Sequence, residues 1–159
     1  MKRILMLVSV LTLSLAASGV SLAQNDPFVG TWKLNVAKSK FTGMSAPKSE
    51  TRTMVAQGNG LKITYDGIAA DGSSISYSIT SNLDGKDSPI GGTSPLGADS
   101  AAIKRVDANT ITSVAKKAGK TIYTTRTVVS KDGKVTTQTV KGTNGDGVPI
   151  SLTTVWDKQ

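Results

Sequence analysis

Hydrophobic and polar positions alternate with a period of two through most of this chain. Leu61, Ile63 and Tyr65 alternate with polar residues, and the same pattern recurs over residues 74–80 and 150–156. Successive side chains of a β-strand point to opposite faces, so the alternation predicts strands with one enclosed face and one face in water. The pattern therefore indicates an all-β protein.

Turn-forming residues interrupt the alternation at regular intervals. Clusters of Gly, Asp, Asn and Pro recur about every 11 to 13 residues, which is the spacing of consecutive hairpins in a sandwich or barrel. No interval is long enough for a crossover helix, so neighbouring strands are expected to be antiparallel. A weaker strand near 87–92 is interrupted by Pro89 and by Gly91-Gly92. The other predicted strands are 29–35, 49–57, 61–68, 73–82, 99–106, 110–117, 121–130, 134–142 and 149–157.

The later strands favour a barrel over a packed sandwich. Residues 121–130 place threonines on both faces, and residues 134–142 are mixed in the same way. A partly polar inner face suits a barrel that holds water and a ligand. We therefore predict an antiparallel up-and-down β-barrel of about eight to ten strands.

The first strand carries one of the two tryptophans of the chain. Alternation puts Gly30, Trp32 and Leu34 on one face of this strand. A tryptophan here buries a large apolar area at a closed end of the barrel while its ring N–H finds a carbonyl, and Gly30 lets another group approach closely. Asn35 is predicted to cap one short helical turn over residues 36–40.

The N-terminal residues have the features of a secretion signal. Lys2-Arg3 precedes an apolar stretch over residues 4–20, which ends in the small-residue pattern Ser21-Leu22-Ala23. The apolar stretch is short for a membrane span. We expect a signal peptide at 1–23, a barrel domain at 24–159 without an integral membrane span, and export to the periplasm or the extracellular space. A retained N-terminal anchor helix is the alternative.

The composition argues against several chemistries. The chain has no Cys and no His, which removes the usual nucleophile–base pairs, the commonest metal ligand and His-ligated haem. No paired carboxylates stand in an apolar setting, so we predict neither catalysis nor a metal or cofactor. The formal net charge is +8, but the basic residues are spread along the chain without interleaved aromatics, so nucleic-acid binding is not expected.

Acidic turns also have an ordinary explanation. Asp84, Asp87 and Asn144-Gly145-Asp146-Gly147 suggest calcium at first sight. A calcium loop supplies about six or more oxygens and usually a closing Glu. Hairpin turn chemistry accounts for these residues without an ion.

The first strand resembles that of a known family. Phe28-Val29-Gly30-Thr31-Trp32-Lys33-Leu34 is similar to the opening of intracellular fatty-acid-binding proteins and, through its Gly-x-Trp, to the calycin group that includes the lipocalins. With Ser39-Lys40-Phe41 it also resembles bacterial exported lipocalin-like proteins. Two features depart from the pattern, because residues 36–47 are too few for the two-helix lid of fatty-acid-binding proteins and the Thr-Asp-Tyr lipocalin motif is missing.

The resemblance implies a barrel that binds a small hydrophobic or amphipathic ligand noncovalently in its interior. In calycins a basic side chain from a late strand packs across the tryptophan, a role that Arg126 or Lys158 would take here beside Gly30 and Trp32. Arg105 and Arg126 would meet a ligand carboxylate if they point inward, and the alternative is that both face solvent. The predicted ligand-binding residues are Met54, Ile63, Tyr65, Ile75, Tyr77, Ile103, Tyr123 and Arg126.

A second function stays open from the sequence. The barrel would act through its outer surface, as an inhibitor or protein-interaction module of the cell envelope. An outer-membrane barrel is disfavoured, because the outward positions are Ser, Thr and Lys rather than an apolar band. In each case we expect a monomer that needs no cofactor.

Overall fold

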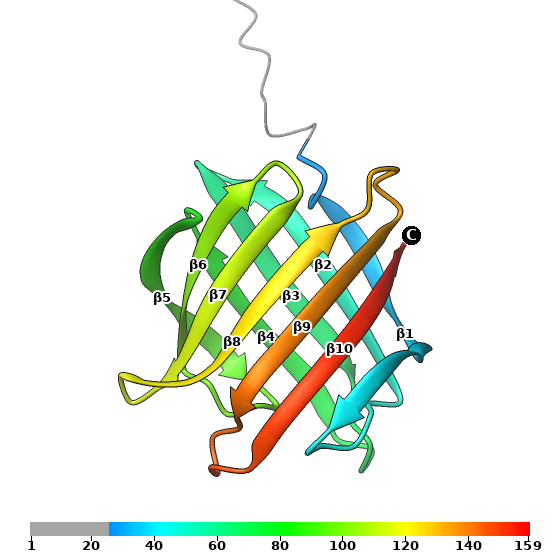
Figure 1. Cartoon of the computed structure of the whole chain (residues 1–159), viewed down its shortest axis with the longest axis vertical. Helices are drawn as coiled ribbons and strands as arrows, with labels where there is room; N and C mark the ends of the chain where they lie inside the picture. The colour runs from blue at the N-terminus through cyan, green and yellow to red at the C-terminus, as the bar shows by residue number, and fades with distance from the viewer. Residues whose placement is uncertain (1–25) are drawn as a thin grey trace, which may run out of the picture.

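The alternating segments fold as strands and most turn clusters fold as hairpins, and together they close a barrel (Figure 1). The computed structural model describes residues 26–159, so the predicted signal peptide lies outside the described residues. The described part contains no helix long and apolar enough to cross a membrane. The strands are β1 (Gly30–Thr42), β2 (Ser49–Gln57), β3 (Gly60–Ile68), β4 (Ser74–Ser81), β5 (Asp84–Thr93), β6 (Ser100–Asp107), β7 (Thr110–Lys117), β8 (Lys120–Val129), β9 (Val135–Thr143) and β10 (Pro149–Lys158).

The strands follow one another around the ring in chain order. Each strand pairs antiparallel with its neighbour along the chain, and β1 closes the ring by pairing with β10. The prediction of an antiparallel up-and-down barrel is therefore confirmed.

The short helical turn predicted after the first strand is wrong. β1 continues to Thr42 and pairs with β10 on both sides of a bulge between Asn35 and Lys40. Asn35 organises the bulge, because its Oδ1 accepts a hydrogen bond from the Lys38 N–H (3.1 Å) and its carbonyl accepts one from Ser39 Oγ (2.7 Å). Pairing with β10 resumes at Lys40, so the local turn is absorbed into the strand.

The segment near residues 87–92 is a full strand, β5, whose two halves pair on different sides. Asp84–Pro89 pairs with β6, and Ile90–Thr93 pairs with β4. Pro89 has no N–H to donate and stands where the partner changes. The Asp84-Gly85 turn signal becomes a register irregularity at the start of β5.

Strands β2, β3 and β4 form a panel that joins the rest of the barrel through short ladders. In the described chain β1 pairs with β2 over Gly30–Lys33, and β4 pairs with β5 over Ser76–Ile79. The ladders inside the panel are longer, since β2 pairs with β3 along Ser49–Gln57 and β3 pairs with β4 along Leu61–Ile68. We call these three strands the β2–β4 panel.

One end of the barrel is closed by the segment before β1. Trp32 and Phe28 are fully buried there, and Trp32 Nε1 donates a hydrogen bond to the Phe28 carbonyl at 2.9 Å. Lys158 Nζ lies 4.9 Å from the centre of the Trp32 ring, within the range of a cation–π contact. Gly30 has a φ of +139°, and a Cβ there would lie 2.7 Å from Lys158 Cε. Of the two candidate cations, Lys158 is therefore the one that covers the tryptophan.

Arg105 belongs to the same closed end. It forms an ion pair with Asp26, and its guanidinium carbon lies 5.2 Å from the centre of the Phe28 ring. Its Nη1 also donates a hydrogen bond to the Ala108 carbonyl at 3.2 Å. These partners neutralise the charge of the Arg105 guanidinium and accept its hydrogen bonds, so it is not free to bind a ligand. Arg105 instead helps to close this end of the barrel.

Candidate ligand-binding site

Two adjoining cavities occupy the barrel interior beyond the closed end. The inner cavity has a volume of about 100 Å³, and the outer one, of about 90 Å³, lies toward the opposite end. Loop residues surround the outer cavity, among them Met44, Pro47, Ala70 and Pro95. The cavities share five lining residues, which define the neck between them: Tyr65, Tyr77, Leu96, Gln138 and Val140.

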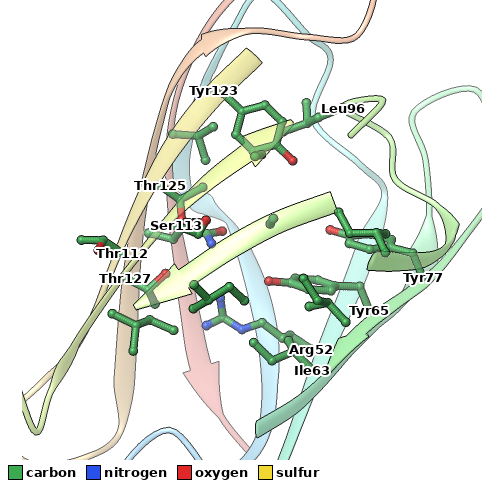
Figure 2. Close-up of a pocket in the computed structure, with 18 of the residues that line it drawn as sticks. Arg52, Ile63, Tyr65, Tyr77, Leu96, Thr112, Ser113, Tyr123, Thr125 and Thr127 are labelled. Atoms are coloured by element: carbon green, nitrogen blue, oxygen red, sulfur yellow. Dashed lines mark hydrogen bonds between the residues drawn. The ribbon is translucent and has the colours of Figure 1, made fainter. Parts of the chain in front are cut away.

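Arg52 is a fully buried arginine at the inner cavity. It shares the inner face of β2 with Met54. Its guanidinium carbon lies 4.5 Å from the centre of the Trp156 ring, and its Nη2 donates a hydrogen bond to Thr136 Oγ1. Figure 2 shows this guanidinium in the space between the strand of Tyr65 and the strands on the far wall.

The guanidinium is only partly satisfied by the protein. Arg52 Nε and Nη1 have no hydrogen-bond partner among residues 26–159. Arg52 also takes part in no ion pair within this described part of the chain. A buried charge is costly unless its donors and its charge are matched. The site is therefore short of an acceptor that carries negative charge.

Glu50 is the carboxylate on the same inner face, two residues before Arg52, and it lines the outer cavity. Burial raises the pKa of Glu50 to about 7, against the lowering effect of the Arg52 charge. Near neutral pH Glu50 is therefore protonated in part of the molecules. In those molecules Arg52 keeps an unbalanced positive charge that a small anion can neutralise.

Aromatic side chains form one wall of the space. The rings of Tyr65 and Tyr77 are stacked, with centres 4.5 Å apart and planes 7° from parallel. Trp156 meets Tyr65 edge-on at 6.1 Å. Burial, with a smaller contribution from Tyr65, raises the pKa of Tyr77 well above its usual value, and burial raises the pKa of Tyr123 to about 12. Both hydroxyls therefore stay protonated and can donate hydrogen bonds.

The wall across the inner cavity from the stacked tyrosines is more polar. Ser113 and Thr125 project into the cavity from β7 and β8, and their hydroxyls are hydrogen-bonded to each other at 2.8 Å (Figure 2). Thr127 lies beside them, and Gln138 of β9 reaches both cavities. The interior therefore combines an aromatic wall, hydroxyl and amide groups, and one incompletely matched cation.

Most residues predicted to bind a ligand line this space. Tyr65 and Tyr77 line both cavities, and Ile75 lines the outer one. The inner cavity is lined by Met54, Ile63, Ile103 and Tyr123.

Arg126 is the residue of that set that the structure places elsewhere. It is exposed on the outer face of β8, because Tyr123 and Thr127 take the inner face and neighbouring positions alternate. The prediction that Arg126 lines the cavity or covers Trp32 is therefore wrong.

The prediction from the sequence missed Arg52, Glu50 and Trp156 as cavity residues. The signal for the two charged residues lies in the alternation of β2, because Glu50 and Arg52 stand at even spacing from Met54, which is predicted to face the interior. Trp156 is fully enclosed, at 2% exposure, and its edge-on contact with Tyr65 depends on a pairing of distant strands.

Comparisons with known proteins do not assign this chain to a family. No protein-family model matches it, and none of the curated proteins matches it. Among solved structures it is similar to zebrafish ileal bile acid-binding protein complexed with cholic acid, with 13% sequence identity and a TM-score of 0.49. That match covers 84% of this chain and 99% of the other.

Proposed function

We propose that this chain is an exported, noncatalytic binding protein that holds a small amphipathic acid inside its barrel. The anionic group of the ligand binds Arg52, and its apolar part occupies the space beside Tyr65 and Tyr77. The observation that carries the proposal is the complete burial of Arg52 with Nε and Nη1 unpartnered among the described residues. The features of residues 1–23 support export.

The chemistry of arginine favours a carboxylate as the missing partner. A guanidinium presents its N–H groups in a planar fork that matches two carboxylate oxygens. Trp156 covers one face of the Arg52 guanidinium and Thr136 takes one of its donors, which leaves two nitrogens for the ligand. An acid bound there supplies both acceptors and the missing negative charge.

Displacement of a neutral fluorescent probe tests the proposal. The two-ring fluorophore 2-naphthol, which is neutral at pH 7, reports occupancy of the interior, and amphipathic acids and their amides compete with it. Loss of a buried charge-assisted hydrogen bond corresponds to about 10- to 100-fold in affinity. We expect Arg52→Met to lower the affinity for the acids by this factor and to leave the affinity for the amides unchanged. Arg126→Met, which removes an exposed arginine of the outer face, is the matched control and keeps wild-type affinities.

Two outcomes would overturn the proposal. One is a probe that no acid displaces, and the other is an acid that binds Arg52→Met as tightly as wild type. If displacement fails and a pull-down from envelope extract recovers a stoichiometric protein partner, the outer surface carries the function instead. Native mass spectrometry of protein purified from its own host would identify a co-purifying acid by its mass.

A further inference from the structure

We propose that the acid is compact and planar, with one ring or two fused rings, and is not a long-chain or steroidal acid. This inference rests on the proposed function, because it adds the shape of the apolar part to the acid group that Arg52 binds. Three features carry it: the size of the interior, the stacked tyrosines of its aromatic wall, and the positions of the charged groups along it.

The interior is small. The inner and outer cavities measure about 100 and 90 Å³. A protein cavity of roughly 150 Å³ holds a single benzene molecule. Each cavity alone is smaller than that, and the two joined through the neck exceed it modestly. A ring system with a carboxylate fits this space, whereas a sixteen-carbon chain, on the same scale of about 150 Å³ for the six carbons of benzene, needs about 400 Å³.

The neck is lined by a pair of stacked aromatic rings. Tyr65 and Tyr77 are only 7° from parallel, and both line the neck. Leu96 and Val140 also line the neck and bound it with aliphatic groups. An aromatic ring can meet this pair edge-on or offset-stacked, the two arrangements that aromatic pairs prefer, whereas a puckered saturated ring has no π-system to do so. Aromatic pairs gain attraction beyond the buried area, which favours an aromatic or conjugated ring.

The charged groups set the direction in which the ligand lies. Arg52 is at the inner cavity and Glu50 at the outer one, with the neck between them. A carboxylate on Arg52 therefore lies deeper in the barrel than Glu50, and the ring occupies the neck. The amide of Gln138 and the hydroxyl of Tyr77 line the same neck and can hydrogen-bond a polar substituent on the ring.

Calorimetric titration with matched ligands tests the inference. The ligands are 2-naphthoate, decahydro-2-naphthoate with the same carbon skeleton but no planarity, palmitate, and the neutral 2-naphthamide. We expect 2-naphthoate to bind about 3- to 10-fold more tightly than its saturated analogue, the factor expected of one aromatic pair. Palmitate should bind more weakly than 2-naphthoate. Tyr77→Leu should bring the planar and saturated acids to equal affinity, and Arg126→Met should leave their ratio unchanged.

The outcomes separate this inference from the function on which it rests. Tighter binding of palmitate or of decahydro-2-naphthoate, with Arg52 still required, overturns the planar, compact ligand and leaves an acid-binding barrel. Binding of no acid, or equal binding of 2-naphthoate and 2-naphthamide, overturns both. The ligand series on the wild-type protein decides the question even if Tyr77→Leu does not fold.

Discussion

Replacing Glu50 with glutamine should stabilise the barrel at high pH and leave it unchanged at low pH. Burial raises the pKa of Glu50 from an ordinary value of 4.5 to about 7 in the folded protein. The folded state therefore holds its proton at pH values where the unfolded chain has released it. Stability falls as the pH rises from about 4.5 to about 7, and above pH 7 the full cost of burying the ionised carboxylate is present.

The size of the effect follows from the shift. One pKa unit corresponds to about 1.36 kcal/mol, so the shift of Glu50 sets an upper limit of about 3 kcal/mol. Glu50 is half-buried, and solvent screening lowers the expected effect to about 2 kcal/mol. A glutamine at position 50 does not ionise and so avoids this cost. The free energy of unfolding of Glu50→Gln should therefore exceed that of wild type by near zero at pH 4.5 and by about 2 kcal/mol at pH 8.

Urea unfolding at several pH values measures this difference. Trp32 and Trp156 are both buried, so tryptophan fluorescence reports loss of the barrel. Asp146→Asn, which removes an exposed carboxylate in the β9–β10 hairpin, is the control and should show no comparable rise between pH 5 and 8. A gain for Glu50→Gln that is the same at pH 5 and pH 8, or a loss at pH 8, would refute the assignment of Glu50 as a buried carboxylate.

Three further predictions follow from the same geometry. The free energy of unfolding of Arg52→Met in urea should be within about 1 kcal/mol of the wild-type value or higher, because replacing an incompletely matched buried charge by an apolar side chain is often neutral or stabilising. A loss of about 3 kcal/mol or more would make Arg52 a structural residue. The affinity of wild type for 2-naphthoate should fall as the pH rises through about 7, as the Glu50 carboxylate ionises near the bound anion, and Glu50→Gln should abolish this dependence in calorimetry between pH 5.5 and 8.5. Gly30→Ala should lower stability by about 1 to 2 kcal/mol in the same urea assay, because an alanine is strained at a φ of +139°; equal stability would contradict that strain.

The architecture was predictable because its signals are local. Period-two alternation and turn residues place strands and hairpins without knowledge of distant partners, and the alternation of the first strand puts Trp32 on its buried face. The errors fall where partner choice decides the outcome. Residues 36–39 form a bulge because β10 pairs with β1 on both sides of them, and β5 is a complete strand because β4 and β6 each take one half of it.

The site was predictable only where apolar residues marked the inner face. Ile63 and Ile75 mark the inner faces of β3 and β4, and Tyr65 and Tyr77 lie two residues further along on the same faces. β8 carries threonines on both faces, so its sequence does not show which face is the inner one or on which face Arg126 lies. Arg52 was missed for a different reason: charged side chains are almost always outside, and a buried one goes against that rule.

The short ladders at the borders of the β2–β4 panel predict that the wall opens most readily along these borders. The panel carries Arg52, Glu50, Tyr65 and Tyr77, while the ladders that hold it are limited to Gly30–Lys33 and Ser76–Ile79 in the described chain. A bound acid that contacts both the panel and the opposite strands would hold these two parts of the wall together. The amides whose exchange with deuterated water slows most on ligand addition should then be those along these two borders, rather than those beside Trp32.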